Sequence, residues 1–220
     1  MLVCGIDEAG RGPVIGPMVM AGVLVESSEV KELSGIGVKD SKLLSQKRRE
    51  ELFDQIISIV KDYSIIIIEP QEIDAALMSE SLNLNWLEAH NSAKIINMLK
   101  PDKIIIDSPS NNVEKYGKYL IELLENKKVE AVVEHKADLN HPECSAASIL
   151  AKVTREKEIA KLKKEFGNFG SGYPSDPLTV KFMKENFRKH SGIFRKTWAP
   201  YRALTEGKKQ KNLNEFEVEK

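Results

Sequence analysis

The sequence predicts an α/β fold: a mixed five-stranded sheet flanked by helices, with a helical extension near the C-terminal end. Short apolar segments rich in Val and Ile alternate with longer segments of helical periodicity. The later strands are each separated by a helix, which is typical of parallel pairing. A short loop of Gly and Pro joins the first two apolar segments, which favours an antiparallel hairpin between them.

Each expected element has a local signal in the sequence. The strands are apolar runs that end at a turn-forming residue or at a carboxylate. We expect them at residues 2–7, 17–26, 63–69, 103–107 and 129–134. The helices carry apolar side chains at spacings of three and four residues. We expect single helices at about residues 45–60, 113–126, 145–166, 178–190 and 197–204, and more than one helical segment between residues 70 and 99.

Capping and helix-breaking residues mark several helix ends, and small or apolar residues indicate which faces are buried. Ser45 is a typical N-cap, and Pro70 and Pro101 interrupt the chain where a strand ends or begins. The helix at residues 145–166 starts with small side chains, which allow close approach to the sheet. The apolar face of the first helix would consist of Leu52, Phe53, Ile56, Ile57 and Val60. The buried residues before Pro101 would be Leu84, Leu87, Ala93, Ile96 and Leu99.

Composition narrows the class of protein. The hydrophobic share of 41% is enough for a sizeable core, and the formal net charge of zero means that any basic surface must be local. The two cysteines have neither metal-ligand nor redox spacing, which favours a reducing compartment. We expect no signal peptide before the first strand, and no apolar run is long enough to span a bilayer. These features predict a cytosolic protein.

Four carboxylates stand at or near strand ends. Asp7 and Glu8 end the first strand, Asp107 ends the fourth, and Asp138 follows the fifth. Strand ends on one edge of an α/β sheet are where such folds bind ligands. Neighbouring side chains of a regular strand point to opposite faces, so Asp7 and Glu8 converge only if the strand stops or bulges there. Each aspartate alone is more typical of a turn or a helix cap.

The coincidence of four acids with the loop Gly10-Arg11-Gly12-Pro13 favours a metal site instead. Carboxylates without His or Cys ligands select hard cations such as Mg²⁺ or Mn²⁺. Two such ions about 4 Å apart activate a water and stabilise the leaving oxygen of a phosphodiester. Backbone N–H groups and Arg11 would then hold the polyanion.

Five segments in this order resemble ribonuclease HII, in its archaeal type. They are Gly5-Ile-Asp-Glu-Ala-Gly-Arg-Gly-Pro13, Val38-Lys-Asp-Ser-Lys-Leu43, Ile106-Asp107, His135-Lys-Ala-Asp138 with Ser145-Ala-Ala-Ser-Ile-Leu-Ala-Lys152, and Gly170-Ser-Gly-Tyr-Pro-Ser-Asp176. The resemblance covers about residues 1–205 and implies a ribonuclease H-like fold. It implies endonucleolytic cleavage of RNA in RNA–DNA hybrids and cleavage 5′ of single ribonucleotides embedded in duplex DNA, for their removal. Two divalent ions would act, and the products would carry 3′-OH and 5′-phosphate ends.

The same resemblance assigns roles to individual residues. Asp7, Glu8, Asp107 and Asp138 match the family's catalytic, metal-binding acids. Gly10, Arg11 and Gly12 match the loop that reads the 2′-hydroxyl at the RNA–DNA junction, and Tyr173 matches the tyrosine that stacks on the following deoxyribose. Elementary chemistry agrees, because the 2′-OH is what distinguishes RNA there and glycine lets backbone groups approach it. The alternative for Tyr173 is a surface residue that packs on Pro174.

The C-terminal part of the chain is basic. Residues 152–202 contain thirteen Lys or Arg and five Asp or Glu, a stripe suited to a duplex backbone or, alternatively, to ordinary solvated helix faces. Nearer the expected site, the candidates for substrate contact are Lys39, Ser41, Lys42, Arg48 and Lys136. His135 and His141 flank Asp138, and we expect them to have no metal-ligand role.

We expect three regions along the chain. Residues 1–166 would form the catalytic domain, residues 167–205 a helical substrate-binding extension, and residues 206–220 a flexible tail. Gln210, Leu213 and Phe216 are similar to the sliding-clamp binding box of archaeal and eukaryotic replication enzymes, although Glu217 replaces its second aromatic residue. The alternative is a charged terminus without a partner. We expect a monomer.

Three rival functions remain. Type 3 ribonuclease H shares the fold but carries an extra N-terminal domain, and the catalytic strand here starts at residue 2. A nucleic-acid-binding module without catalysis would not explain four crowded acids, which destabilise a fold unless a cation compensates them. A resolvase or integrase of the same superfamily would not require a ribonucleotide in its substrate.

Overall fold

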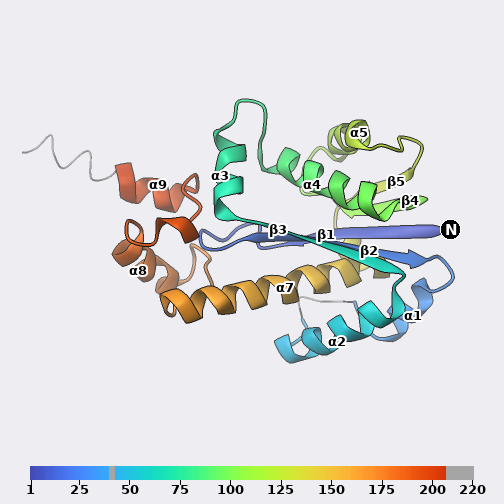
Figure 1. The fold of residues 1–220 in the computed structure, drawn as a ribbon, viewed down its shortest axis with the longest axis horizontal. Helices are drawn as coiled ribbons and strands as arrows, with labels where there is room; N and C mark the ends of the chain where they lie inside the picture. The colour runs from blue at the N-terminus through green and yellow to red at the C-terminus, as the bar shows by residue number, and fades with distance from the viewer. Residues whose placement is uncertain (40–42, 207–220) are drawn as a thin grey trace, which may run out of the picture.

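The computed structural model describes residues 1–39 and 43–206, which form a single mixed sheet with helices on both faces (Figure 1). The strands are β1 (Leu2–Ala9), β2 (Met18–Glu26), β3 (Asp62–Ile68), β4 (Lys103–Asp107) and β5 (Glu130–Glu134). The described α-helices are α1 (Val30–Gly35), α2 (Gln46–Ile59), α3 (Pro70–Met78), α4 (Leu84–Leu99), α5 (Val113–Leu123), α6 (Ala137–Asn140), α7 (Pro142–Phe166), α8 (Pro177–Asn186) and α9 (Ala199–Glu206). A 3₁₀ turn, η1 (Ser191–Ile193), lies between α8 and α9.

The strand order is β3-β2-β1-β4-β5, and it confirms the mixed sheet that the sequence predicts. β1 pairs with β2 as an antiparallel hairpin, and β3 adds to the outer side of β2, also antiparallel. β4 pairs with β1 in parallel, and β5 pairs with β4 in parallel. Because β1 and β4 are parallel neighbours at the centre, their carboxyl ends meet at one edge of the sheet.

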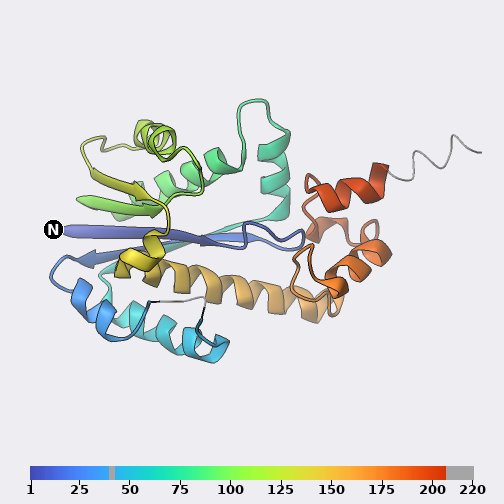
Figure 2. The same ribbon diagram turned by 180° about the vertical axis from the view of Figure 1, so that it is seen from behind.

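The helices form two layers around this sheet. Helices α3, α4 and α5 cover one face, and α7 with α1 and α2 covers the other, as both views show (Figures 1 and 2). One core cluster lies between β1, β4 and helices α4 and α5, and includes Cys4, Ile6 and Ile106. A second cluster lies against α2 and α7 and includes Val19 and Leu150.

Close contact between α7 and β1 depends on a glycine. A methyl group added at Gly5 would overlap the backbone of Glu143 and Cys144 at the start of α7. The first turns of α7 consist mainly of buried small residues, as the sequence predicts for a helix that lies close to a sheet. This contact fixes α7 along the full length of β1 and carries its later turns past the end of the strand.

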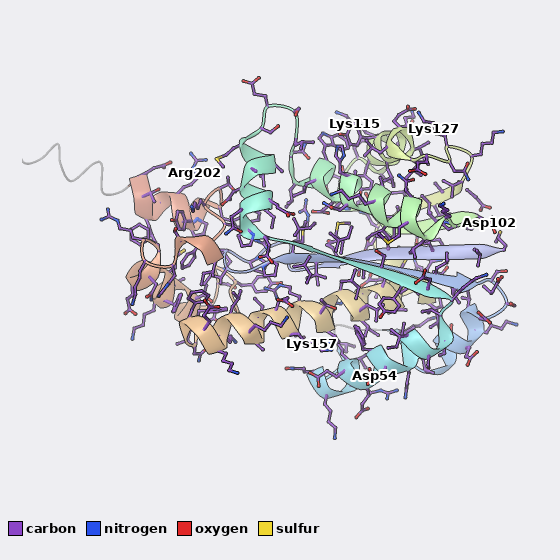
Figure 3. All side chains as sticks on the ribbon, in the orientation of Figure 1. Asp54, Asp102, Lys115, Lys127, Lys157 and Arg202 are labelled. Atoms are coloured by element: carbon purple, nitrogen blue, oxygen red, sulfur yellow. The ribbon has the colours of Figure 1, made fainter. Side chains whose placement is uncertain are left out.

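The C-terminal helices α8 and α9 lie beyond the carboxyl end of β1 (Figure 1). They form a third apolar cluster with Val14, Ile15 and Phe169. Their outer surfaces are charged, and Figure 3 labels Lys157 on α7 and Arg202 on α9, both of which are exposed. The predicted helical extension is therefore packed on the segment that follows β1.

Several expected boundaries need correction. β1 continues through Ala9 instead of stopping at residue 7, and α7 begins at Pro142 instead of residue 145. Short helices α1 and α6 were not predicted, because six and four residues are too few for a clear periodicity. Ile57 is 36% exposed, so it does not belong to the buried face of α2.

Some predictions fall on residues that the structure does not describe. Ser41 and Lys42 lie in one undescribed stretch, and Gln210, Leu213 and Phe216 lie in the other. No helix in the described part of the chain has both the length and the apolar character that a membrane span requires.

Candidate active site

Four acidic residues, Asp7, Glu8, Asp107 and Asp138, lie around the carboxyl edge of the central strands. Asp7 and Glu8 belong to β1, Asp107 is the last residue of β4, and Asp138 lies in α6 directly after β5. Since Ile6 pairs in parallel with Ile106, Asp7 and Asp107 are the next residues along two neighbouring strands. The sheet topology thus brings together residues that are 100 positions or more apart in sequence.

Asp7 is buried at 7% exposure and points toward α7. Its Oδ1 accepts a hydrogen bond from the backbone N–H of Glu8 at 2.8 Å, and the hydroxyl of Ser148 on α7 also binds its carboxylate. Lys152, one turn further along α7, donates to the Ser148 hydroxyl at 2.9 Å. Burial, aided by the charge of Asp107, raises the pKa of Asp7 to about 6, against the opposing effects of Ser148 and Lys152.

Glu8 lies on the other face of the strand. The register stays regular, with Asp7 opposite Ala21 and Glu8 opposite Met20, so β1 neither stops nor bulges at the acids. The expected condition for their convergence is therefore not met. Burial and the nearby charges of Asp7, Glu88 and Asp107 raise the pKa of Glu8 well above its ordinary value. The two acids approach the carboxyl end of β4 from opposite sides of the sheet.

Asp107 and Asp138 are held by the segment after β5. The backbone N–H of Lys136 donates to Oδ1 of Asp107 at 2.8 Å, and Lys136 has the left-handed backbone conformation with φ of 61°. Asp138 is 4% exposed, and its carbonyl oxygen accepts a hydrogen bond from the hydroxyl of Ser145. The left-handed residue turns the chain sharply, so that α6 places Asp138 beside the edge.

The donor chemistry of these side chains fits a hard divalent cation. All four supply carboxylate oxygens. Burial, with a smaller contribution from neighbouring carboxylates, raises the pKa of Asp7 and Glu8, and a bound cation would offset both effects. Among the residues that the structure describes, no three Asp, Glu, His or Cys side chains are already gathered closely enough to hold a metal ion. Small movements of these side chains would therefore have to accompany metal binding.

The loop after β1 is held from beneath by Arg195. Gly10 has φ of 83°, and the buried Arg195 guanidinium donates to the carbonyl oxygens of Gly10 at 2.6 Å, Arg11 at 2.8 Å and Gly16 at 3.1 Å. Trp198 donates its indole N–H to the carbonyl of Gly12 at 3.1 Å. The C-terminal extension thus fixes the loop through its carbonyl oxygens.

Arg11 is engaged by α4. Its Nε donates to Glu88 at 2.8 Å and its Nη2 donates to Asn85 at 2.6 Å. Burial, opposed by Arg11, raises the pKa of Glu88 to about 7. These contacts tie the glycine loop to α4, and the expected role of Arg11 in holding a polyanion stays a prediction.

Tyr173 lies beside the same loop, from the segment between α7 and α8. A methyl group added at Gly12 would lie 3.4 Å from the Tyr173 ring, and the guanidinium of Arg155 is 5.7 Å from the ring centroid. Tyr173 is 39% exposed. Its ring therefore borders the cleft that Glu8 and the glycine loop line.

The remaining predicted contact residues are more dispersed. Lys39 and Lys136 are exposed. Arg48, on α2, forms an ion pair with Glu51 at 3.2 Å and donates to the carbonyl of Ile36 at 3.0 Å. Neither contact of Arg48 involves one of the four acids, whereas the backbone N–H of Lys136 donates to Asp107.

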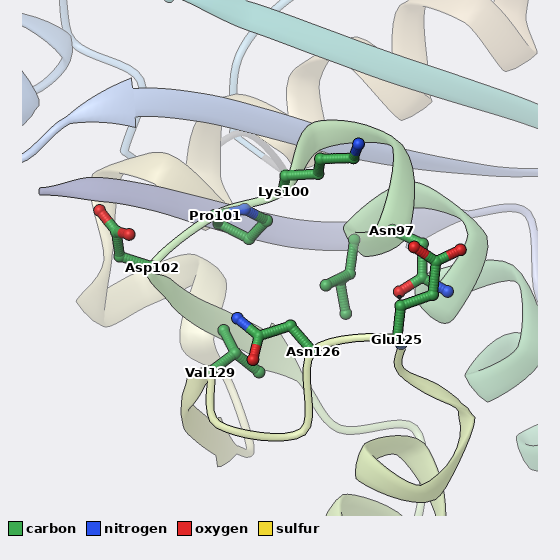
Figure 4. Close-up of a pocket in the computed structure, with 8 residues that line it drawn as sticks. Asn97, Lys100, Pro101, Asp102, Glu125, Asn126 and Val129 are labelled. Atoms are coloured by element: carbon green, nitrogen blue, oxygen red, sulfur yellow. Dashed lines mark hydrogen bonds between the residues drawn. The ribbon is translucent and has the colours of Figure 1, made fainter.

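A cleft of about 430 Å³ lies next to the glycine loop. Its lining residues are Glu8, Ala9, Gly10, Arg11, Gly12, Arg49, Lys152, Arg155, Glu156 and Tyr173. Another hollow lies at the amino end of β4, where Lys100, Asp102, Glu125 and Asn126 surround it (Figure 4). It is at the opposite end of the strand from Asp107, so it is separate from the acidic edge.

Sequence reasoning missed Ser148, Glu88, Arg155 and Arg195. Glu88 carried a usable signal, since it lies four residues after Leu84 and seven before Ile95 on an apolar face of α4, where a charge is unusual. Ser148 belongs to the small-residue start of α7, which we assigned to packing and to the family motif but gave no role at the site. Arg155 and Arg195 carried no signal that separates them from the other basic residues of the C-terminal part.

The sequence of this chain is similar to known proteins over nearly its whole length. The ribonuclease HII family model matches residues 4–200. Ribonuclease HII of Pyrococcus furiosus is 47% identical to this chain, over 96% of this chain and 94% of that protein. Ribonuclease HII of Thermococcus sibiricus is 44% identical, over 98% of this chain and 96% of that protein.

Solved structures agree with the sequence matches. The crystal structure of ribonuclease H2 from Pyrococcus horikoshii has a TM-score of 0.87 at 40% identity and covers 96% of this chain and 100% of that one. The RNase HII of the PCNA:RNase HII complex from Archaeoglobus fulgidus has a TM-score of 0.81 at 41% identity, and the match covers 90% of this chain and 95% of that one. Bst-RNase HIII, in complex with Mn²⁺, has the same fold with a TM-score of 0.78 at 20% identity and extends further, since only 71% of that chain is covered.

The sheet order and the acids at the carboxyl ends of β1 and β4 define a nuclease of the ribonuclease H type. Within that class, the family match over residues 4–200 and the identities of 44% and 47% to its members are decisive. The chain belongs to the ribonuclease HII family.

Proposed function

We propose that this protein hydrolyses RNA in RNA–DNA hybrids and cuts 5′ of single ribonucleotides embedded in duplex DNA, leaving 3′-OH and 5′-phosphate ends. The observation that carries the proposal is the position of the acidic edge next to the Gly10–Gly12 loop and Tyr173. The acids suit hydrolysis of a phosphodiester, and the loop and the ring suit recognition of the sugars on either side of a junction.

Asp7, Glu8, Asp107 and Asp138 would hold the divalent ions, Mg²⁺ or Mn²⁺. When bound, such ions supply an activated water and neutralise charge on the leaving oxygen. Ser148 and Lys152 orient the carboxylate of Asp7 from the α7 side. The backbone of Lys136 orients Asp107 from the β5 side. These contacts limit the rotamers of two of the four ligands before a metal arrives.

The glycine loop would read the ribose. Arg195 engages the carbonyl oxygens of Gly10 and Arg11, and this leaves the opposite side of the loop toward the cleft. Without a Cβ at Gly10 or Gly12, the sugar can approach the backbone closely enough for a hydrogen bond to its 2′-OH. The Tyr173 ring would then stack on the next sugar, which fits best when it is deoxyribose.

Under this assignment, two regions of the chain have different roles. Residues 1–166 carry the acids, and residues 167–205 carry Tyr173 and Arg195, so we assign catalysis to the first region and substrate positioning to the second. Contacts of the exposed basic residues at 152–202 with the duplex backbone would add affinity without reading sequence. A cytosolic location and a monomeric state belong to the same proposal.

The tail would bind a sliding clamp. This proposal depends on Gln210, Leu213 and Phe216, which lie outside the described residues, and it gains support from the PCNA complex of the Archaeoglobus fulgidus relative. Clamp binding to the full chain should be lost on deletion of residues 207–220 and weakened by Phe216→Ala. Equal binding by all three proteins would contradict it.

A cleavage assay tests the main proposal. A labelled DNA duplex with one ribonucleotide is compared with an all-DNA duplex, each in Mg²⁺, in Mn²⁺ and in EDTA. We expect one metal-dependent cut directly 5′ of the ribonucleotide and no cut in the control. Equal cutting of both duplexes would indicate another nuclease activity, and binding without cutting would indicate a module without catalysis.

A further inference from the structure

The backbone that carries Tyr173 is fixed to the segment after the glycine loop. The carbonyl oxygen of Gly172 accepts hydrogen bonds from the backbone N–H groups of Val14 at 2.8 Å and Ile15 at 3.3 Å. The N–H of Gly172 donates to the hydroxyl of Thr179 at 3.0 Å. The position of the Tyr173 α-carbon is therefore set by the backbone, and the direction of its ring depends on what packs against it.

Arg155 packs against both the glycine loop and this ring. It lies on α7, three residues after Lys152 and on the same side of the helix. A methyl group added at Gly10 would overlap Nε and Cδ of Arg155. The guanidinium carbon is 5.7 Å from the centroid of the Tyr173 ring, whose edge lies beside Gly12. Arg155 thus occupies the space between the start of the loop and the aromatic ring.

Stability alone does not explain an arginine at this position. Within the described part of the chain, Nε and Nη2 of Arg155 are sealed from solvent and have no hydrogen-bond partner. Leaving buried donors unsatisfied is unfavourable for folding. Burial lowers the pKa of Arg155, and Arg195 places a second guanidinium nearby. A neutral side chain of similar length would fill the same space without these penalties.

We propose that Arg155 is a positioning residue that fixes the Tyr173 ring relative to the Gly10–Gly12 loop and thereby sets the preference for an RNA–DNA junction. A planar guanidinium can hold an aromatic ring by stacking and by attraction to its π electrons, which a point charge does less well. The inference rests on the proposed function, because it assumes that the loop reads a ribose and the ring the following sugar.

The test compares two substrates across a set of variants. One substrate has a single ribonucleotide followed by deoxynucleotides, and the other has an all-RNA strand paired with DNA, and kcat and KM are measured on both. The variants are Arg155→Met, Arg155→Lys, Tyr173→Ala and the double variant Arg155→Met/Tyr173→Ala. Lys115→Met is the matched control, since Lys115 on α5 is exposed, lies 5.7 Å from the centroid of the Trp86 ring and is outside the basic stripe of residues 152–202.

We expect Arg155→Met to lower the preference for the junction substrate by about threefold to thirtyfold, the range of a cation–π contact. The double variant should be no worse than Tyr173→Ala alone, because Arg155 acts through the ring. Arg155→Lys should lie between wild type and Arg155→Met, and the control should match wild type. The melting temperature of Arg155→Met should equal or exceed that of wild type.

Two results would overturn the inference. One is equal loss of rate on both substrates together with a lower melting temperature, which a purely structural role would give. The other is additive effects of Arg155→Met and Tyr173→Ala on the junction preference, which would mean that Arg155 does not act through Tyr173.

A second readout is independent of cleavage. Fluorine NMR of protein containing 3-fluorotyrosine reports on the ring of each of the five tyrosines, and Tyr173→Phe identifies the resonance of residue 173. Arg155→Met should shift or broaden this resonance, and Lys115→Met should not. An unchanged Tyr173 resonance in Arg155→Met would refute the positioning role. Failure of wild type to cut either substrate would instead refute the proposed function, while this measurement still tests Arg155.

Discussion

The carboxylate of Glu88 on α4 accepts a hydrogen bond from Nε of Arg11 at 2.8 Å, and the two residues are 77 positions apart in the chain. Glu88 is fully buried, whereas Arg11 remains partly exposed. The contact joins the glycine loop to the helix layer on the opposite side of the sheet from α7. The loop is therefore held from two sides, by Glu88 through the Arg11 side chain and by Arg195 through backbone carbonyls.

Removal of the Glu88 carboxylate should loosen this loop. We expect Glu88→Ala to lower the free energy of unfolding by about 1–3 kcal/mol, the usual effect of losing a hydrogen bond to a charged group, and to reduce activity. Glu88→Gln keeps an acceptor for Arg11 and should lie closer to wild type. Chemical denaturation and cleavage rates give both quantities. Glu122→Ala, which removes an exposed ion pair with Lys127, is the control and should change neither.

Neutralising Asp7 should separate activity from stability. Asp7→Asn should reduce metal-dependent cleavage by about a thousandfold or more, because it removes a proposed ligand of the divalent ions. Without metal, its melting temperature should match or exceed that of wild type, since a buried carboxylate beside Glu8 and Asp107 is relieved of repulsion. Asp54→Asn, on the exposed face of α2, should leave both properties unchanged. Wild-type cleavage rates in Asp7→Asn would contradict the assignment of the site.

Three glycine substitutions separate backbone strain from steric overlap. Gly10→Ala combines a φ of 83° with overlap onto Arg155, and we expect a loss of at least about 2 kcal/mol of stability. Gly37→Ala has a φ of 84° but open space around its Cβ, so about 1 kcal/mol should be lost. Gly35→Ala has neither problem and should change little. Urea denaturation of the three variants measures this order, and equal losses for Gly10 and Gly37 would argue against the close contact with Arg155.

The two cysteines should be unreactive in the folded protein. Both are buried free thiols, and burial raises the pKa of Cys4 to about 12 and that of Cys144 well above its ordinary value. An unfolded thiol ionises near pH 8.5, so the native state binds more protons above that pH and its stability falls as the pH rises toward 12. Alkylation by iodoacetamide at pH 8.5 should be slow until denaturant unfolds the chain. Rapid alkylation of the native protein would contradict the burial of both thiols.

Sequence reasoning located most of the elements, because their signals are local. β4 was predicted with its observed bounds, and Ser45 caps α2 through a hydrogen bond from the Arg48 N–H at 3.2 Å. The alternation of strands and helices also led to the expectation of parallel pairing among the later strands, and β4 and β5 do pair in parallel. The misplaced boundaries lie where a short helix has too few residues for a periodicity, or where tertiary contacts extend a strand beyond its apolar run.

The sequence by itself determined the chemistry: the four acids, the glycine loop, Tyr173 and the order of motifs that resembles the family. Only the tertiary structure decided that Asp7 and Glu8 face opposite sides of an unbroken strand, that Arg11 is tied to α4, and that Arg155 lies between Gly10 and Tyr173. The reason is physical. Residue type and local spacing govern propensity and metal preference, whereas the partner of a side chain depends on packing between segments as distant as Gly10 and Arg195, which are 185 positions apart.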